Sequence, residues 1–210
     1  MASSAGVVGR ARQVGTRESL LLALLVVGLV AGTDLIDFGA YHLRYAILDA
    51  STASSWSHRL DAAVLVAGAG LCVMGASRAR YRRGTWLALA AILAFLFVDE
   101  VSTLHTQIGH LGYGKLLYAP VLAAAVLAVW KLTAGTAFVV ALPSALAVLS
   151  ASYVIHVLGP GVVRALGWGP SSWAYQLKVG LKEGAELAGL LLALLVLSGA
   201  ALDVDPQRLR

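Results

Sequence analysis

Two adjacent carboxylates near the end of an apolar stretch are the residues of this sequence best suited to chemistry. Asp99 and Glu100 interrupt the run GTWLALAAILAFLFVDEVSTLH, residues 84–105. An ionised carboxylate inside a bilayer is costly, so acidic residues in such stretches mark functional sites by default. A low dielectric favours the neutral carboxyl, which can donate a proton. The pair is therefore a candidate Brønsted acid and its partner, although a helix end that emerges into water would also carry such residues.

A second pair of carboxylates lies near the start of the last apolar stretch, in YQLKVGLKEGAELAG, residues 175–189. Glu183 and Glu186 are three residues apart and share one helical face, and Lys182 is four residues before Glu186. Such a face could form a wall of a catalytic or metal-binding site. A salt-bridged helix start, whose acids favour the positive end of the helix dipole, explains the spacing as well. The candidate catalytic residues are Asp99, Glu100, Glu183 and Glu186.

Other polar and aromatic side chains at the same predicted level of the membrane could line a substrate pocket. Aromatic rings can stabilise a cation, but an interfacial aromatic belt explains them equally well. The histidines could ligate a metal together with the acids. Because no HxxxH or HExxH spacing is present, we predict no metal and no other cofactor. The residues assigned to the pocket are Ser102, Thr103, His105, Tyr153, His156 and Trp173.

The elements that must position these residues are membrane-spanning helices. The chain of 210 residues is 59% hydrophobic and 13% charged, with a mean hydropathy of +0.81, which is typical of an all-α polytopic membrane protein. We expect one bundle over 18–202 between cytoplasmic tails at 1–17 and 203–210. Interfacial loops are expected at 39–59 and 159–175, and Pro143 should kink the fifth span. The six predicted spans are 18–38, 60–77, 84–110, 116–131, 134–157 and 176–202.

The distribution of charge orients this predicted bundle. Six spans place both termini on one side, and the basic run RARYRR, residues 78–83, lies on that side. The positive-inside rule then favours an N-in, C-in topology in the cell membrane. Most of the acids and all five histidines fall on the opposite, outer side. We therefore expect the site to lie at the outer end of the bundle, with span 6 facing Asp99 and Glu100.

The sequence lacks the motifs of several classes of protein. The net charge of +5 comes from short basic segments beside spans, which topology explains, so we expect no nucleic-acid partner. The single cysteine, Cys72, excludes an intramolecular disulfide and a cysteine-rich metal site. No GxxxxGK[ST], GxGxxG or aspartate-rich DDxxD pattern is present. Nucleotide-driven chemistry and magnesium-diphosphate ionisation are therefore not predicted.

The order of three motifs resembles a group of small bacterial six-helix membrane proteins. The motifs are DASTASSWS, FVDEVSTLH and YQLKVGLKEGAELAG. The group typically has an LDE-xxx-xHE run followed by an LEE-xxE-xxG run. This sequence has Thr106 and Lys182 where the group usually has glutamates. The resemblance implies a six-helix bundle, and these two departures weaken the implication of a shared metal site.

In size, span number and lack of aspartate-rich motifs, the sequence also resembles actinobacterial integral-membrane terpene cyclases. That resemblance implies proton-initiated cyclisation of a lipophilic prenylated, or epoxidised, substrate through a carbocation. Asp99 or Glu100 would be the acid, and Glu183 or Glu186 would tune it and accept the final proton. The partners would be the lipid bilayer and this lipophilic small molecule.

Two other functions remain open on the residues alone. A metal-dependent membrane hydrolase of a lipid amide or ester would combine the histidines with the acids and activate water on a bound cation. The second is a function without catalysis, as a proton-coupled carrier or an accessory membrane subunit. A carrier is expected to have acids across the whole bilayer, whereas here they gather in the outer half.

Overall fold

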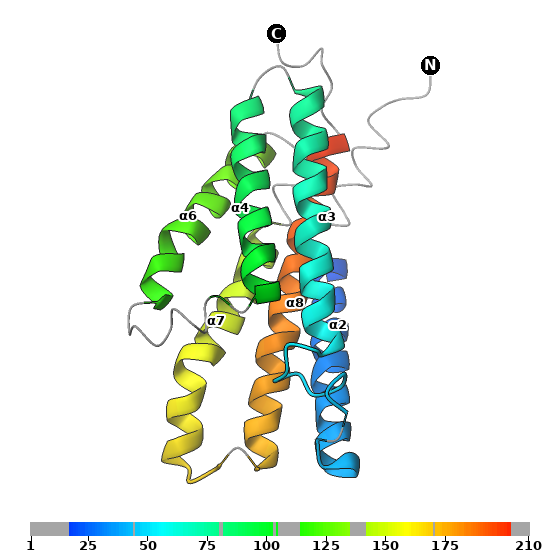
Figure 1. Cartoon of the computed structure of the whole chain (residues 1–210), viewed down its shortest axis with the longest axis vertical. Coiled ribbons are helices and arrows are strands. Elements are labelled where there is room, and N and C mark those ends of the chain that lie inside the picture. The colour runs from blue at the N-terminus through cyan, green and yellow to red at the C-terminus, as the bar shows by residue number, and fades with distance from the viewer. Residues whose placement is uncertain are drawn as a thin grey trace. The chain divides into compact units, whose positions relative to one another are not determined.

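The computed structural model describes residues 17–43, 45–79, 82–102, 104, 114–134, 142–169 and 171–202. Over these ranges the chain forms six α-helices and one π-helical turn, and no strand (Figure 1). The predicted all-α class is therefore confirmed. The elements are α2 (Arg17–Ile36), η1 (Asp37–Tyr41), α3 (Trp56–Arg78), α4 (Arg83–Ser102), α6 (Gly114–Thr133), α7 (Leu142–Ala165) and α8 (Trp173–Leu202).

Among the described residues, five helical segments are long and apolar enough to cross a membrane. They are Arg17–Tyr41, Trp56–Arg78, Arg83–Ser102, Leu142–Ala165 and Trp173–Ala201, while α6 contributes the shorter apolar stretch Ala119–Thr133. Their large aliphatic residues are often on the outside: Leu24 of α2 is 69% exposed, whereas Ala23 beside it is buried. This inversion of the usual soluble pattern suits helices whose outer faces contact lipid.

The contacts within the chain define two compact units. One unit comprises Thr16–Asp61 and Pro143–Leu192, and the other comprises Ala62–Leu142 with the C-terminal part from Ala193. The first unit, which we call the His58 unit, holds α2, η1, the start of α3, α7 and most of α8. The second, which we call the Trp86 unit, holds the rest of α3, α4 and α6, and the end of α8.

In the His58 unit, α8 packs closely on α2 through glycines. A Cβ placed on Gly180 would lie 2.7 Å from the Cα of Ala31, and one placed on Gly184 would lie 2.8 Å from the Cα of Val27. Such distances leave no room for a side chain. These glycines therefore give α8 a small-residue packing face, and its partner is α2.

Buried acids of α2 and η1 hold the segment that leads to α3. Asp34 accepts a hydrogen bond from the Ala50 N–H at 2.8 Å, and Asp37 accepts one from the Tyr45 N–H at 3.2 Å. Both acids are fully buried. The predicted loop over 39–59 was too long at both ends, because the first span continues through η1 to Tyr41 and α3 begins at Trp56.

The prolines of α7 correct two further predictions. The described helix begins at Leu142, so Pro143 lies in its first turn, where its missing N–H removes no helical hydrogen bond and no kink is required. Pro160 lies inside α7, which runs to Ala165. The prediction of a loop from 159 was therefore wrong, since the Gly-Pro pair is accommodated in the helix. The last helix also begins earlier than predicted, at Trp173.

The Trp86 unit is organised around a buried indole. Trp86 of α4 is 2% exposed, and its ring lies against Gly75 of α3, where a Cβ would be only 2.7 Å from the indole. The neighbouring helix α6 contacts α4. This unit carries Asp99 and Glu100 in the last turn of α4.

Candidate functional site

The first turn of α3 is fixed by a serine cap. Ser55 precedes the helix, and its hydroxyl accepts a hydrogen bond from the His58 N–H at 3.3 Å, the usual bond of an N-cap residue. Ser57 lies 3.0 Å from the same hydroxyl, and both serines are buried. The indole N–H of Trp56 donates to the Thr33 hydroxyl at 3.1 Å. The backbone that carries His58 is therefore tied to α2.

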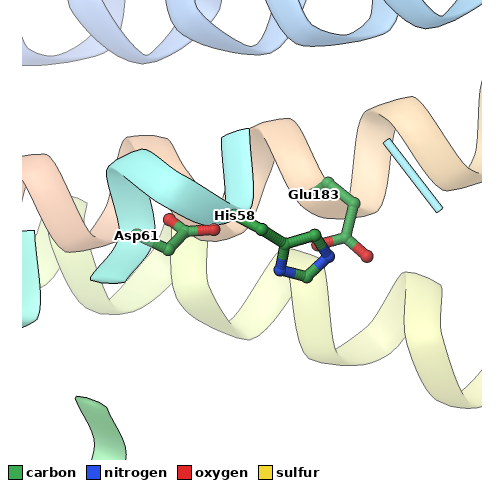
Figure 2. A group of neighbouring side chains, drawn as sticks. All are labelled: His58, Asp61 and Glu183. Carbon is green, nitrogen blue, oxygen red and sulfur yellow. The ribbon is translucent and has the colours of Figure 1, made fainter. Parts of the chain in front are cut away.

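Three titratable side chains converge in the His58 unit. His58 and Asp61 are three residues apart on α3 and share one helical face, and Glu183 reaches them from α8. One ligand atom from each residue lies within 4.8 Å of the other two. Figure 2 shows the imidazole of His58 pointing toward the carboxylate of Glu183, and their Nε2 and Oε2 atoms are 3.8 Å apart. Asp61 and Glu183 are 2% and 7% exposed.

Lys182 connects this cluster to a further acid. Its ammonium nitrogen lies 2.8 Å from Oε1 of Glu183 and 2.9 Å from Oε2 of Glu186. The two oxygens of Glu183 are therefore used differently. Oε1 accepts the hydrogen bond from Lys182, whereas Oε2 is buried and accepts no hydrogen bond from the residues that the structure describes.

The charges of this group do not balance. Among the described residues, Lys182 is the ammonium that forms ion pairs with Glu183 and Glu186, and Asp61 adds a third carboxylate. Lys178 is close enough to Glu183 to interact electrostatically with it. Asp34 is also close enough to interact electrostatically with Glu183. A buried carboxylate oxygen without a donor is expensive unless a cation or a proton compensates it. A protonated His58 or a bound metal ion could supply that compensation.

The spacing of the three ligand atoms suits a metal ion with a small adjustment. Ligands bound at about 2.1 Å around a tetrahedral ion lie about 3.4 Å apart. Since the ligand atoms lie within 4.8 Å of one another, the side chains would have to close by at most about 1.4 Å, which torsional adjustment can provide. Three protein ligands leave one position for water or substrate, as in catalytic zinc sites.

The predicted catalytic residues fall in different units. Glu183 and Glu186 share Lys182 in the His58 unit, which confirms the expected pair of Lys182 and Glu186. Asp99 and Glu100 belong to the Trp86 unit, where Asp99 is buried and Glu100 is half-buried. The expectation that the two acid pairs form one site stays a prediction.

The residues predicted to line a pocket are mostly on the surface or outside the described ranges. Tyr153 and Trp173 are 56% and 57% exposed, and His156 is exposed. Trp173 packs edge-to-face on Phe38, with ring centroids 4.9 Å apart. Ser102 donates a hydrogen bond to the Val98 carbonyl at 2.6 Å. Thr103 and His105 lie outside the residues whose side chains the structure describes.

His58 and Asp61 are the site residues that sequence reasoning missed. The signal was present as an H-x-x-D spacing, which places an imidazole and a carboxylate on one helical face. It was missed because the second span was predicted to begin at Leu60, which left His58 in a loop. The SSWS run before it, with a serine three residues ahead of His58, is the helix-start signal that moves α3 back to Trp56.

The described residues form helices, five segments of which are long and apolar enough to cross a membrane, and they carry a buried His–carboxylate group. The chain belongs to the family described as a domain of unknown function, DUF8692, whose model matches residues 19–200. Neither the comparison with curated proteins nor the comparison with solved structures finds a match.

Proposed function

We propose that this chain is a multi-pass protein of the cell membrane that binds a divalent transition-metal ion at His58, Asp61 and Glu183. We further propose that it hydrolyses an ester or amide bond of a lipophilic substrate. The observation that carries the proposal is the buried Oε2 of Glu183, which faces His58 at 3.8 Å and accepts no hydrogen bond from the described residues. A cation between Oε2 of Glu183 and Nε2 of His58 would neutralise this oxygen and coordinate it.

The donor set favours an ion of the zinc class. Imidazole is a common ligand of zinc and its neighbours in the first transition row, and carboxylates complete many of these sites. The excess negative charge of the cluster also favours a divalent cation. Lys182 does not compete for the metal-facing oxygen, because it binds Oε1 of Glu183. It would instead orient that carboxylate, as hydrogen-bonding partners of metal ligands usually do.

The metal ion would act as a Lewis acid and would make a bound water a better nucleophile. In the reaction, water adds to the carbonyl carbon, the C–O or C–N bond breaks, and the departing alkoxide or amide leaves with a proton from that water. Glu183 and the Lys182–Glu186 pair would keep the ligand geometry fixed through this change. A lipophilic substrate would arrive through the bilayer, since the outer faces of the helices are apolar.

Metal analysis of the purified full-length protein tests this assignment. We expect about one zinc-class ion per chain, and loss of that ion in His58→Asn. His42→Asn is the matched control, because His42 is exposed and its left-handed backbone, with φ of 53°, tolerates asparagine. Hydrolysis of fluorogenic lipid esters and amides should fall with the metal content. A wild-type protein that folds and takes up no such ion would overturn the proposal.

The second candidate is the proton-initiated cyclase, and the burial of Asp99 favours it. Asp99 is 7% exposed in the last turn of an apolar helix, and a carboxyl is a side chain that can serve as a general acid. A cyclase should turn over prenylated or epoxidised aromatic compounds in the presence of a chelator. Asp99→Asn should then abolish product formation, while Glu18→Gln, an exposed acid at the start of α2, should not.

A further inference from the structure

A cavity of about 490 Å³ belongs to the Trp86 unit, whereas the chemistry proposed above belongs to the His58 unit. It is lined by Arg82, Thr85, Trp130, Lys131 and Ala134. These residues bring the start of α4 together with the end of α6. The lining joins two cationic side chains, a hydroxyl and an indole, which is a combination suited to an anionic group at the edge of an apolar phase.

The cations at this cavity have no acidic partners among the described residues. No carboxylate in the described ranges pairs with Arg82, Arg83 or Lys131, and Arg82 and Arg83 are both exposed. Membrane topology explains why basic residues gather at one end of the helices. It does not explain why two of them face one cavity.

Arg82 is held in an unusual way. Its backbone has φ of 63°, a left-handed conformation that costs a non-glycine residue energy. Its Nη1 donates a hydrogen bond to the backbone carbonyl of Lys131 in the last turn of α6. The guanidinium is thereby fixed at the cavity and keeps its other N–H groups for a ligand.

We infer that this cavity binds the phosphate group of an anionic phospholipid. A guanidinium fork and an ammonium recognise phosphate oxygens well, and the N-terminus of the 20-residue α4 adds favourable backbone amides. Trp130, which is 53% exposed, suits the headgroup region. A lipid is the expected source of the phosphate because the cavity lies at the ends of apolar helices.

Lipid-dependent thermal stability of the full-length protein in detergent tests the inference. Phosphatidylglycerol should raise the melting temperature saturably, whereas phosphatidylcholine should not. Arg82→Gln should weaken the apparent affinity about fivefold, and Arg82→Gln with Lys131→Gln should weaken it about thirtyfold. Arg83→Gln is the matched control, because it removes the same charge from the next residue, which does not line the cavity. It should leave the affinity within about twofold of wild type.

Each alternative result contradicts the inference in a different way. Equal losses in Arg82→Gln and Arg83→Gln would mean that charge alone attracts the lipid. An equal rise with inorganic phosphate would assign the cavity to the free ion. If a variant is too unstable to melt cooperatively, native mass spectrometry of Arg82→Lys, which keeps the charge but loses the fork, should still show reduced retention of phosphatidylglycerol. Unchanged retention there would also reject the site.

Discussion

Glu183 connects two different groups through its two carboxylate oxygens. Oε1 accepts the hydrogen bond from Lys182 at 2.8 Å, and Oε2 faces His58 at 3.8 Å. Glu186 contacts only the other side of Lys182 within the cluster. The two glutamates are therefore unequal, although their spacing in the sequence treats them alike. Glu183 is a candidate ligand, and Glu186 is a candidate positioning residue.

Substituting each glutamate by glutamine separates these roles. Glu183→Gln removes the charge of a metal ligand. Loss of a hydrogen-bonding partner of a ligand typically lowers metal affinity about 10–100-fold, and we expect the loss in Glu183→Gln to be larger than that. In Glu186→Gln the loss of metal affinity should stay within about 10–100-fold, because Lys182 keeps its contact with Glu183. Competition with a chromophoric chelator measures both affinities. Equal losses in the two variants would contradict the separate roles.

Residue chemistry could be predicted from the sequence only where the helix boundaries were predicted well. Glu183 and Glu186 lie well inside an apolar helix, so their shared face could be expected from spacing alone. His58 lies in the first turn of α3, and an error of a few residues in the helix start removed it from consideration. That Glu183 meets α3 rather than another helix depends on tertiary packing, which no local pattern encodes.

At the scale of elements, close packing of α2 on α8 places Glu183. Gly184, the next residue after Glu183, lies against the backbone of Val27, and Gly180 lies against Ala31 one turn earlier. In a bilayer, helices gain little from burying apolar surface, so close backbone approach and dispersion contacts supply the association. The distance between the two helix axes therefore depends on these small residues.

A methyl group at Gly184 should separate the two helices. Gly184→Ala would put a Cβ 2.8 Å from the Cα of Val27, and we expect destabilisation of about 1–3 kcal/mol from overpacking. Gly32→Ala in α2 is the control, because nothing lies within 4 Å of its added Cβ. Alanine should be neutral there or stabilise by up to about 1 kcal/mol. Thermal unfolding in detergent compares the variants, and equal melting temperatures would contradict this packing.

The helices themselves were predictable, while their ends were less so. Long apolar runs indicate α2, α3, α4, α6, α7 and α8, because only a helix satisfies its own backbone in hydrocarbon. Proline misled the prediction in α7, since a proline inside a membrane helix is tolerated when surrounding groups compensate for the lost hydrogen bond. Pro160 lies inside the helix, and Pro143 lies in the first turn.

At the scale of the whole molecule, the number of crossings decides where the termini lie. In the part of the chain that the structure describes, five segments meet the length and hydropathy expected of a span, and α6 has the shorter apolar stretch Ala119–Thr133. α6 is nevertheless a 20-residue helix, about 30 Å long at 1.5 Å per residue, which matches the hydrocarbon thickness. If α6 crosses, six spans return the chain to its starting side. If it does not, the termini lie on opposite sides.

We expect six crossings, because α6 is long enough to span the hydrocarbon. We expect both termini in the cytoplasm, because the basic run from Arg78 to Arg83 then lies inside as well. A fluorescent protein fused after Arg210 should be bright, and alkaline phosphatase fused there should be inactive, since the phosphatase matures only outside the cytoplasm. A phosphatase fusion after Thr52, which follows the first span, should be active and serves as the control. An active phosphatase at Arg210 with the control also active would indicate five crossings, and would place the α6 stretch on the membrane surface.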